Sequence, residues 1–163
     1  QVAVGAIKYS ILRQRPGKDI IFDFEKSLSF EGDSGPYLQY TCVRAKSVLA
    51  KAKESAEGEA KGSTLRAPKV EPWNPASPSA PISTVEKLLY RFPEVVERAT
   101  IDYAPNYLVT YLTDLATAFN SYYVANKIIG SAEETYRLAL TAAVAQVLEN
   151  GLNLLGIRVP AKM

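Results

Sequence analysis

The chain has 163 residues, of which 47% are hydrophobic and 22% charged, and this is the composition of an ordinary globular domain. Its net charge is only +2, from 19 basic and 17 acidic residues, which is too weak to indicate nucleic-acid binding by itself. No apolar run approaches the roughly 18 residues that cross a bilayer. A transmembrane protein is therefore excluded, and we expect no membrane partner.

The counts of histidine, cysteine and methionine restrict the chemistry further. Histidine is absent, which removes most zinc sites, His-based triads and His general bases. The single cysteine, Cys42, excludes an internal disulfide framework and favours a reducing, cytoplasmic location. The only methionine is the last residue, Met163, so we expect a fragment with an artificial start. A Gly-rich phosphate loop is also missing, which argues against a free-standing enzyme.

Hydrophobic residues recur at helical spacing through most of the chain. The predicted helices cover residues 1–15, 36–57, 83–91, 93–101, 105–129 and 131–155. The β-branched and aromatic run 19–24 predicts a short strand or an extended piece. Helices that are striped on one face and joined by short turns pack as a bundle. We therefore predict an all-α fold, a helical bundle of about six helices with at most one short N-terminal strand.

Capping patterns mark the starts of three of these helices. Ser83 and Glu86 match a capping box, and so do Ser131 and Glu134. A loop before Pro36 offers Ser34 or Asp33 as the cap of the helix over 36–57.

Residues 58–82 differ sharply in composition from their surroundings. Five of the ten prolines fall here, together with glycines and several serines. The segment is longer than ordinary connections, so we predict a long Pro-rich loop or insertion. Trp73, the only tryptophan, lies in its middle. Trp73 pins this loop onto the bundle, forms a spot for a partner or lies in a disordered loop, and the sequence leaves these alternatives open.

At about 100° per residue, the helix over 36–57 carries two separate stripes. The stripe assigned to the core comprises Leu38, Cys42, Ala45, Leu49 and Ala52. The other stripe comprises Tyr37, Tyr40, Arg44, Ser47 and Lys51. Rings and guanidinium planes stack on unpaired bases and cations meet phosphates, so this stripe suits single-stranded RNA. In the alternative, which spacing alone favours, both tyrosines pack under a neighbouring helix.

The run SFEGDSGPYLQY, residues 29–40, shifts the interpretation of this stripe from packing toward RNA binding. It closely resembles the stretch at the entrance to the helical anticodon-binding domain of arginyl-tRNA synthetases. Further strings resemble the same family in the same order, namely residues 5–9, 19–24, 115–123, 137–140 and 150–163. The resemblance covers nearly the whole chain except 58–82, and it is specific because several long strings agree.

The resemblance implies a DALR-type domain of a class I synthetase that lacks its front end. Residues 1–30 would be the connecting segment from the missing catalytic domain, and 31–163 the anticodon-binding domain. The family's ATP motif contains histidine, so this chain cannot hold it. We expect the fragment to be inactive and without a cofactor, with ATP and Mg bound by the missing catalytic domain. The expected partners are that domain and the anticodon loop of tRNA-Arg, and we expect a monomer.

The resemblance also implies which residues contact RNA. They are Tyr37, Tyr40, Arg44, Tyr123, Lys127 and Met163. The two tyrosines at 37 and 40 would stack on anticodon nucleotides, and Arg44 would meet a base or phosphate. Lys127 stands where some members carry a second aromatic, which weakens the correspondence there. Met163 would pack near the middle anticodon base, unless it is only a frayed terminus.

Every arginine codon has G in its middle position, so a middle C is common to all arginine anticodons. The sequence thus predicts that this base is read. The alternative function is a helical protein–protein interaction domain without RNA specificity.

Overall fold

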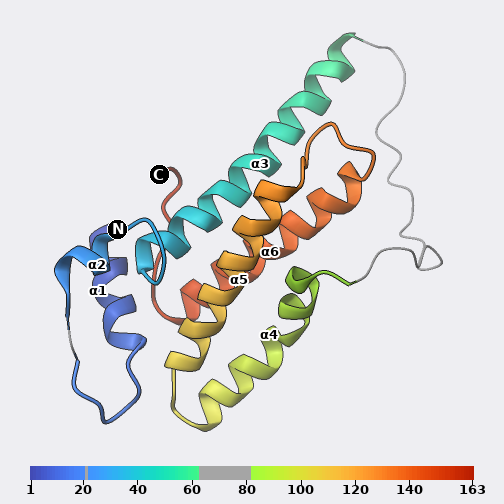
Figure 1. The fold of residues 1–163 in the computed structure, drawn as a ribbon. Helices are drawn as coiled ribbons and strands as arrows, with labels where there is room; N and C mark the ends of the chain where they lie inside the picture. The colour runs from blue at the N-terminus through green and yellow to red at the C-terminus, as the bar shows by residue number, and fades with distance from the viewer. Residues whose placement is uncertain (21, 63–81) are drawn as a thin grey trace.

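The structure, a computed structural model, describes residues 1–20, 22–62 and 82–163, and it describes side chains in these ranges outside 56–62. The prediction about Trp73 lies outside the described residues. Within them the helices are α1 (Val2–Leu12), α2 (Phe24–Leu28), α3 (Gly35–Gly62), α4 (Thr84–Ile101), α5 (Asn106–Ala125) and α6 (Glu134–Leu154). The predicted all-α bundle is confirmed (Figure 1).

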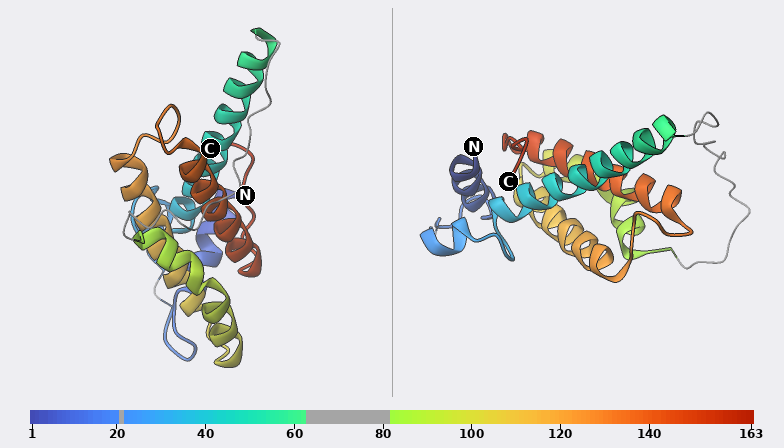
Figure 2. Two further views of the ribbon diagram at one scale, coloured as in Figure 1. Left: turned by 90° about the vertical axis from the view of Figure 1, so that its right-hand side faces the viewer. Right: turned by 90° about the horizontal axis from the view of Figure 1, so that it is seen from above.

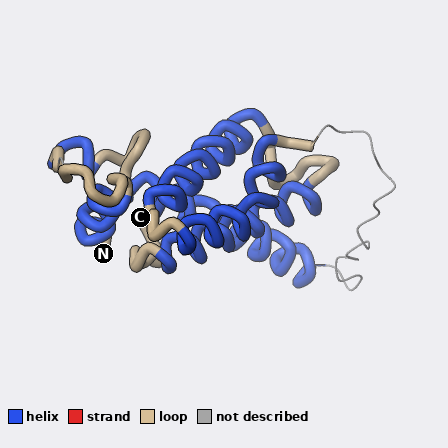
Figure 3. The backbone as a smooth tube through the Cα atoms, turned by 90° about the horizontal axis from the view of Figure 1, so that it is seen from below, coloured by secondary structure: helices blue, strands red, loops and turns tan. Residues whose placement is uncertain are grey.

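The short strand is absent from the described residues, where all regular structure is helical (Figure 3). The residues of the run 19–23 that the structure describes are irregular, and Phe24 already begins α2. A lone extended run has no partner strand to satisfy its backbone groups. Asp23 instead caps α2, because its carboxylate accepts a hydrogen bond from the Lys26 N–H at 3.1 Å.

The predicted break at Pro93 is wrong, because α4 runs through it as one helix. Proline in a helix removes one backbone donor, and it usually kinks or ends the helix. Here the apolar face of α4 outweighs that loss. Leu88, Phe92 and Val96 pack against the buried core from both sides of the proline.

Other helix boundaries also differ from the prediction. α1 ends at Leu12 rather than near 15, and α3 continues to Gly62, so residues 58–62 are helical and do not belong to the predicted Pro-rich loop. α5 ends at Ala125 rather than near 129, because Asn126 adopts an extended backbone. The capping box at Ser131 does not form: its hydroxyl donates to the Ile128 carbonyl, and Glu134 accepts from the Gly130 N–H. The box at Ser83 and Glu86 is confirmed, with both reciprocal hydrogen bonds present. Ser34 caps α3, since its Oγ accepts from the Tyr37 N–H at 3.1 Å.

α5 packs against α3, α4 and α6 (Figures 1 and 2). Leu112, Leu115 and Phe119 of α5 are fully buried. α6 comes very close to α5, since a Cβ at Gly151 would lie 2.5 Å from a methyl carbon of Leu112. On α3, Cys42 fills a core position as predicted.

α1 and α2 pack at the N-terminal end of α3, on the side where both chain termini lie (Figure 1). The division of the chain at residue 30 stays a prediction. No described helix is long and apolar enough to cross a bilayer.

A candidate nucleic-acid interface on α3 and α5

Tyr37 lies half-buried between α3 and α5 and packs against the core. Its hydroxyl accepts a hydrogen bond from Asn120 Nδ2 at 3.0 Å. Asn120 also donates to Thr41 Oγ1 at 3.0 Å, so one amide of α5 ties two positions of α3. The packing alternative therefore describes Tyr37 well: only part of its ring remains available to a ligand.

Tyr40 and Arg44 face outward one and two turns further along α3, and Tyr123 of α5 lies beside them. The Arg44 guanidinium carbon lies 4.2 Å from the Tyr123 ring centroid and 5.9 Å from the Tyr40 ring centroid. Cation–π contacts of this kind contribute about 0.5–1 kcal/mol at exposed sites. Together they hold the guanidinium in place before any ligand arrives, while Tyr40 remains 37% exposed.

A cavity of about 350 Å³ adjoins this cluster. It is lined by Arg44, Ser47, Val48, Lys51, Tyr123, Asn126, Lys127, Ile128 and Ile129. The lining contains three cations, an aromatic ring and an amide but no carboxylate. Its size falls within the range of small-ligand pockets. An unpaired base with its phosphate fits this combination of a ring to stack on and cations to neutralise charge.

Tyr40, Arg44, Tyr123 and Lys127 are therefore brought together, and we call these four residues the α3–α5 face. Met163 is not joined to them by any hydrogen bond, ion pair or ring contact in the described part of the chain. It is 41% exposed at the end of the tail. That tail is fixed to α3 nearby, because Gln39 Nε2 donates to the Arg158 carbonyl at 2.7 Å.

The sequence analysis missed Asn120 and Asn126. Asn120 positions Tyr37 through its hydrogen bond, and Asn126 lines the cavity. Asn120 stands inside the string 115–123 that carried the resemblance, so a polar residue within that string was an available signal. Nothing in the sequence marked Asn126.

A second network supports the start of α3. The hydroxyl of buried Tyr9 is hydrogen-bonded to Asp33 and, at 2.8 Å, to Thr113 of α5. Arg13 forms an ion pair with the same carboxylate. Burial, together with the hydrogen bond to Asp33, raises the pKa of Tyr9. The sequence offered Asp33 as a possible cap of α3. In the structure Asp33 instead anchors the loop before α3 to α1.

Among the described residues, no group of three or more Cys, Asp and Glu side chains is arranged to hold a metal ion. The candidate site thus consists of cations, rings and amides. Such a set binds and orients a polyanion.

The sequence and the fold agree on one family. The DALR anticodon binding domain family matches residues 38–163. The chain belongs to this family.

Among the proteins similar to this chain are arginine–tRNA ligases and arginyl-tRNA synthetases. The chain is 40% identical to an arginine–tRNA ligase of Thermococcus kodakarensis over 99% of its own length and 25% of that protein. It is 39% identical to the arginine–tRNA ligase of Pyrococcus furiosus, over 100% of the chain and 25% of that protein. The arginyl-tRNA synthetase of Thermus thermophilus has a similar fold, with a TM-score of 0.74 and 34% identity over 99% of the chain and 26% of that structure. The chain thus spans about a quarter of the length of these relatives.

Proposed function

We propose that this chain is the anticodon-binding module of an arginine–tRNA ligase and that it holds the anticodon loop of tRNA-Arg. The parent enzyme would attach arginine with ATP and Mg in a catalytic domain outside these 163 residues. The module's contribution is positional, because it fixes one end of the tRNA so that the other end reaches a remote site.

One observation carries the proposal: Arg44 is held between two tyrosine rings beside a cationic cavity. An arginine that is already oriented loses little freedom when it meets a base edge or phosphate. The exposed Tyr40 ring beside it offers a stacking platform, and stacking is worth about 1–3 kcal/mol per base.

The test is a titration of the chain with two labelled anticodon stem-loops. One carries an arginine anticodon with its middle C, and the other has that C replaced by A. We expect a preference of about tenfold or more for C, or about 1.4 kcal/mol. Equal affinity for the two loops contradicts the proposal and favours a surface without RNA specificity.

Three variants test which residues produce the preference for the middle C. Tyr40→Ala is expected to reduce it, because the stacking platform is lost. Arg44→Lys keeps the charge but loses the planar guanidinium, so we expect the base preference to fall more than the overall affinity. Tyr90→Ala is the matched control, because Tyr90 is an 88% exposed tyrosine on α4 and lies outside the site.

A further inference from the structure

The loop between α5 and α6, residues 126–133, forms one wall of the cavity beside the α3–α5 face. It lies at the end of the bundle away from both chain termini (Figure 1). Four residues of this loop line the cavity, namely Asn126, Lys127, Ile128 and Ile129. The shape of the cavity, and the position of the Lys127 cation in it, therefore depend on how the loop is held.

Arg137, in the first turn of α6, holds the middle of this loop. Its Nη1 donates a hydrogen bond to the Lys127 carbonyl at 2.7 Å, and its Nη2 forms an ion pair with Glu133 at 2.8 Å. A hydrogen bond from a charged donor is roughly twice as strong as a neutral one. Arg137 is not among the residues that line the cavity. It therefore acts on the cavity wall through the backbone of Lys127.

The remaining hydrogen bonds of the loop lie toward its ends. Near the start, the Asn126 side-chain amide donates to a carbonyl of α5 at 2.9 Å. Toward the end, the Gly130 N–H donates to a carboxylate of α6 at 2.7 Å. Among the described residues, the Lys127 carbonyl accepts a hydrogen bond from Arg137 and from no other group. Loss of the guanidinium therefore releases the loop between these two fixed points.

The burial of Arg137 is unfavourable for stability. Its side chain is only 18% exposed, and its Nε is buried without a hydrogen-bond partner. A buried charged group with an unmet donor costs free energy, and a well-packed apolar side chain is often as stabilising as a buried ion pair. Packing of the bundle by itself therefore does not explain an arginine at this position, whereas support of the Lys127 carbonyl does.

The side chain of Lys127 lies back over the loop that Arg137 holds. Its Nζ is 3.5 Å from the position that a Cβ on Gly130 would take. Gly130 has a positive φ of 72°, which glycine adopts without strain. A free lysine samples many rotamers, and ordering its backbone as well would add to the cost of binding. The fixed loop thus keeps the ammonium group within reach of a phosphate in the cavity.

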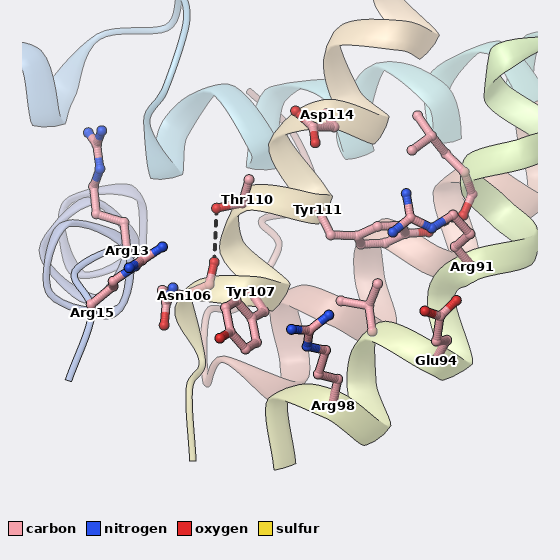
Figure 4. A pocket seen from close by; sticks show the side chains of 12 residues that line it. Arg13, Arg15, Arg91, Glu94, Arg98, Asn106, Tyr107, Thr110, Tyr111 and Asp114 are labelled. Carbon is pink, nitrogen blue, oxygen red and sulfur yellow. Dashed lines mark hydrogen bonds between the residues drawn. The ribbon is translucent and has the colours of Figure 1, made fainter. Parts of the chain in front are cut away.

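A different group of arginines lies at a cavity of about 490 Å³ between α1, α4 and α5 (Figure 4). Arg98 of this group pairs with Asp102 at 3.7 Å and lies over the Tyr107 ring at 5.3 Å. Within the described residues it donates no hydrogen bond to a backbone carbonyl. Arg98 is therefore a matched control for Arg137, because each forms an ion pair with a residue four positions away and only Arg137 also holds a loop.

We propose that Arg137 is the positioning residue of the cavity beside the α3–α5 face. Without touching the RNA, its guanidinium holds the Lys127 carbonyl and thereby sets the wall against which the bound nucleotide lies. This inference rests on the proposed function, because it takes the same RNA loop as the ligand.

The experiment titrates Arg137→Gln and Arg137→Lys with the middle-C and middle-A stem-loops, after circular dichroism has shown that each variant is folded. Arg137→Lys keeps the charge and the apolar stem but loses the planar, two-armed donor, so it tests the proposal even if Arg137→Gln does not fold. We expect both variants to lower the preference for the middle C from about tenfold to about threefold or less. Arg98→Gln should keep the wild-type preference.

A double-variant cycle tests whether Arg137 acts through Lys127. A phosphate contact on a single strand contributes about 0.7 to the slope of log K against log salt, or about fivefold between 1 M and 0.1 M salt. We expect Lys127→Gln and Arg137→Gln each to weaken binding of the middle-C loop about fivefold at 0.1 M salt. Their double variant should also bind about fivefold more weakly, whereas independent effects would multiply to about twenty-fivefold. A merely structural role of Arg137 would not make the two effects overlap.

The outcomes distinguish the two proposals. If the Arg137 variants keep the wild-type preference, or if the double variant loses about twenty-fivefold, the positioning role is overturned and the proposed function stands. An equal loss of preference in Arg98→Gln indicates a general effect of charge and also overturns the positioning role. If the wild-type chain binds both loops equally, the proposed function is overturned, whereas overlapping effects of Arg137→Gln and Lys127→Gln would still show that Arg137 positions Lys127.

Discussion

Arg44 shows how the fold orders a half-buried side chain in the absence of a ligand. A free arginine samples many rotamers, and ordering it on binding costs free energy. In this chain the Tyr123 ring lies 4.2 Å below its guanidinium, so much of that ordering is present before binding. The tyrosine at 37 serves a different purpose, since its hydroxyl is used by Asn120 and its ring helps to join two helices.

Glu86 is a residue whose charge state controls the start of α4. Burial alone raises the pKa of Glu86, but the hydrogen bonds that its carboxylate accepts from Ser83 outweigh burial and lower the pKa below its ordinary 4.5. Tyr136 of α6 donates to the same carboxylate; burial, with that bond, raises the pKa of Tyr136 to about 12. The folded state therefore favours the ionised carboxylate of Glu86 over the protonated carboxyl group.

The pH dependence of stability follows from that shift. A folded-state pKa below the unfolded one gives stability that is complete above about pH 5 and is lost as the pH falls through the folded pKa. We expect urea midpoints measured from pH 6 to pH 3 to fall more steeply for the wild type than for Glu86→Gln, which keeps a capping side chain but does not titrate. Glu97→Gln changes an exposed carboxylate on the same helix and should follow the wild type. Parallel curves for wild type and Glu86→Gln would contradict the assignment.

Among the elements, α3 connects the core to the candidate interface. One side of it is buried against α5 and α6, and the adjacent side presents Tyr40 and Arg44. Its first turn is held by α1 at very short range. A Cβ on Gly35 would lie 2.7 Å from the Gly5 carbonyl oxygen and 3.0 Å from the Tyr9 Cβ. Only glycine permits this approach of two helices, and the position of the interface depends on it.

Gly35→Ala is therefore expected to push α1 away from α3. The contacted atoms are backbone and Cβ atoms, which cannot yield by rotation, so we expect a loss of about 1–3 kcal/mol in the free energy of unfolding. RNA binding should weaken as well, because the tyrosines follow within two turns. Ala50→Ser adds an atom at an exposed position of the same helix and should change stability by less than about 0.5 kcal/mol. An unchanged urea midpoint for Gly35→Ala would show that α1 is not packed as described.

Considered as a whole, the molecule returns its C-terminal tail to the end where α1 and α3 begin. Gly156 ends α6 with a positive φ of 68°, the Ile157 N–H bonds back to the Leu152 carbonyl at 2.8 Å, and Ile157 is buried. Gln39 then holds the Arg158 carbonyl. Beyond this anchor, residues 161–163 are exposed. The anchored part of the tail thus belongs to the packed fold, whereas the last three residues are free of the core.

Removal of residues 161–163 tests whether the exposed end of the tail contributes to RNA affinity without contributing to stability. The urea midpoint should not change, because the buried Ile157 and the Gln39 hydrogen bond remain. Affinity for the arginine stem-loop should fall about fivefold, or about 1 kcal/mol, if Met163 covers apolar surface of the bound base. Met163→Ala in the full chain should reproduce most of the loss, and Lys162→Gln should not. Undiminished affinity of the truncated chain would remove Met163 from the interface.

The sequence by itself determined the helices, most of their buried stripes and the family, because spacing at 3.6 residues and long matching strings are local properties. Its main error was also local: Pro93 was given more weight than the apolar face that carries α4 through it. Only the tertiary structure decided which side chains meet. The stacking of Arg44 on Tyr123 and the hydrogen bond between Tyr37 and Asn120 join residues about 80 positions apart. Such contacts depend on how whole helices pack, which no short stretch of sequence encodes.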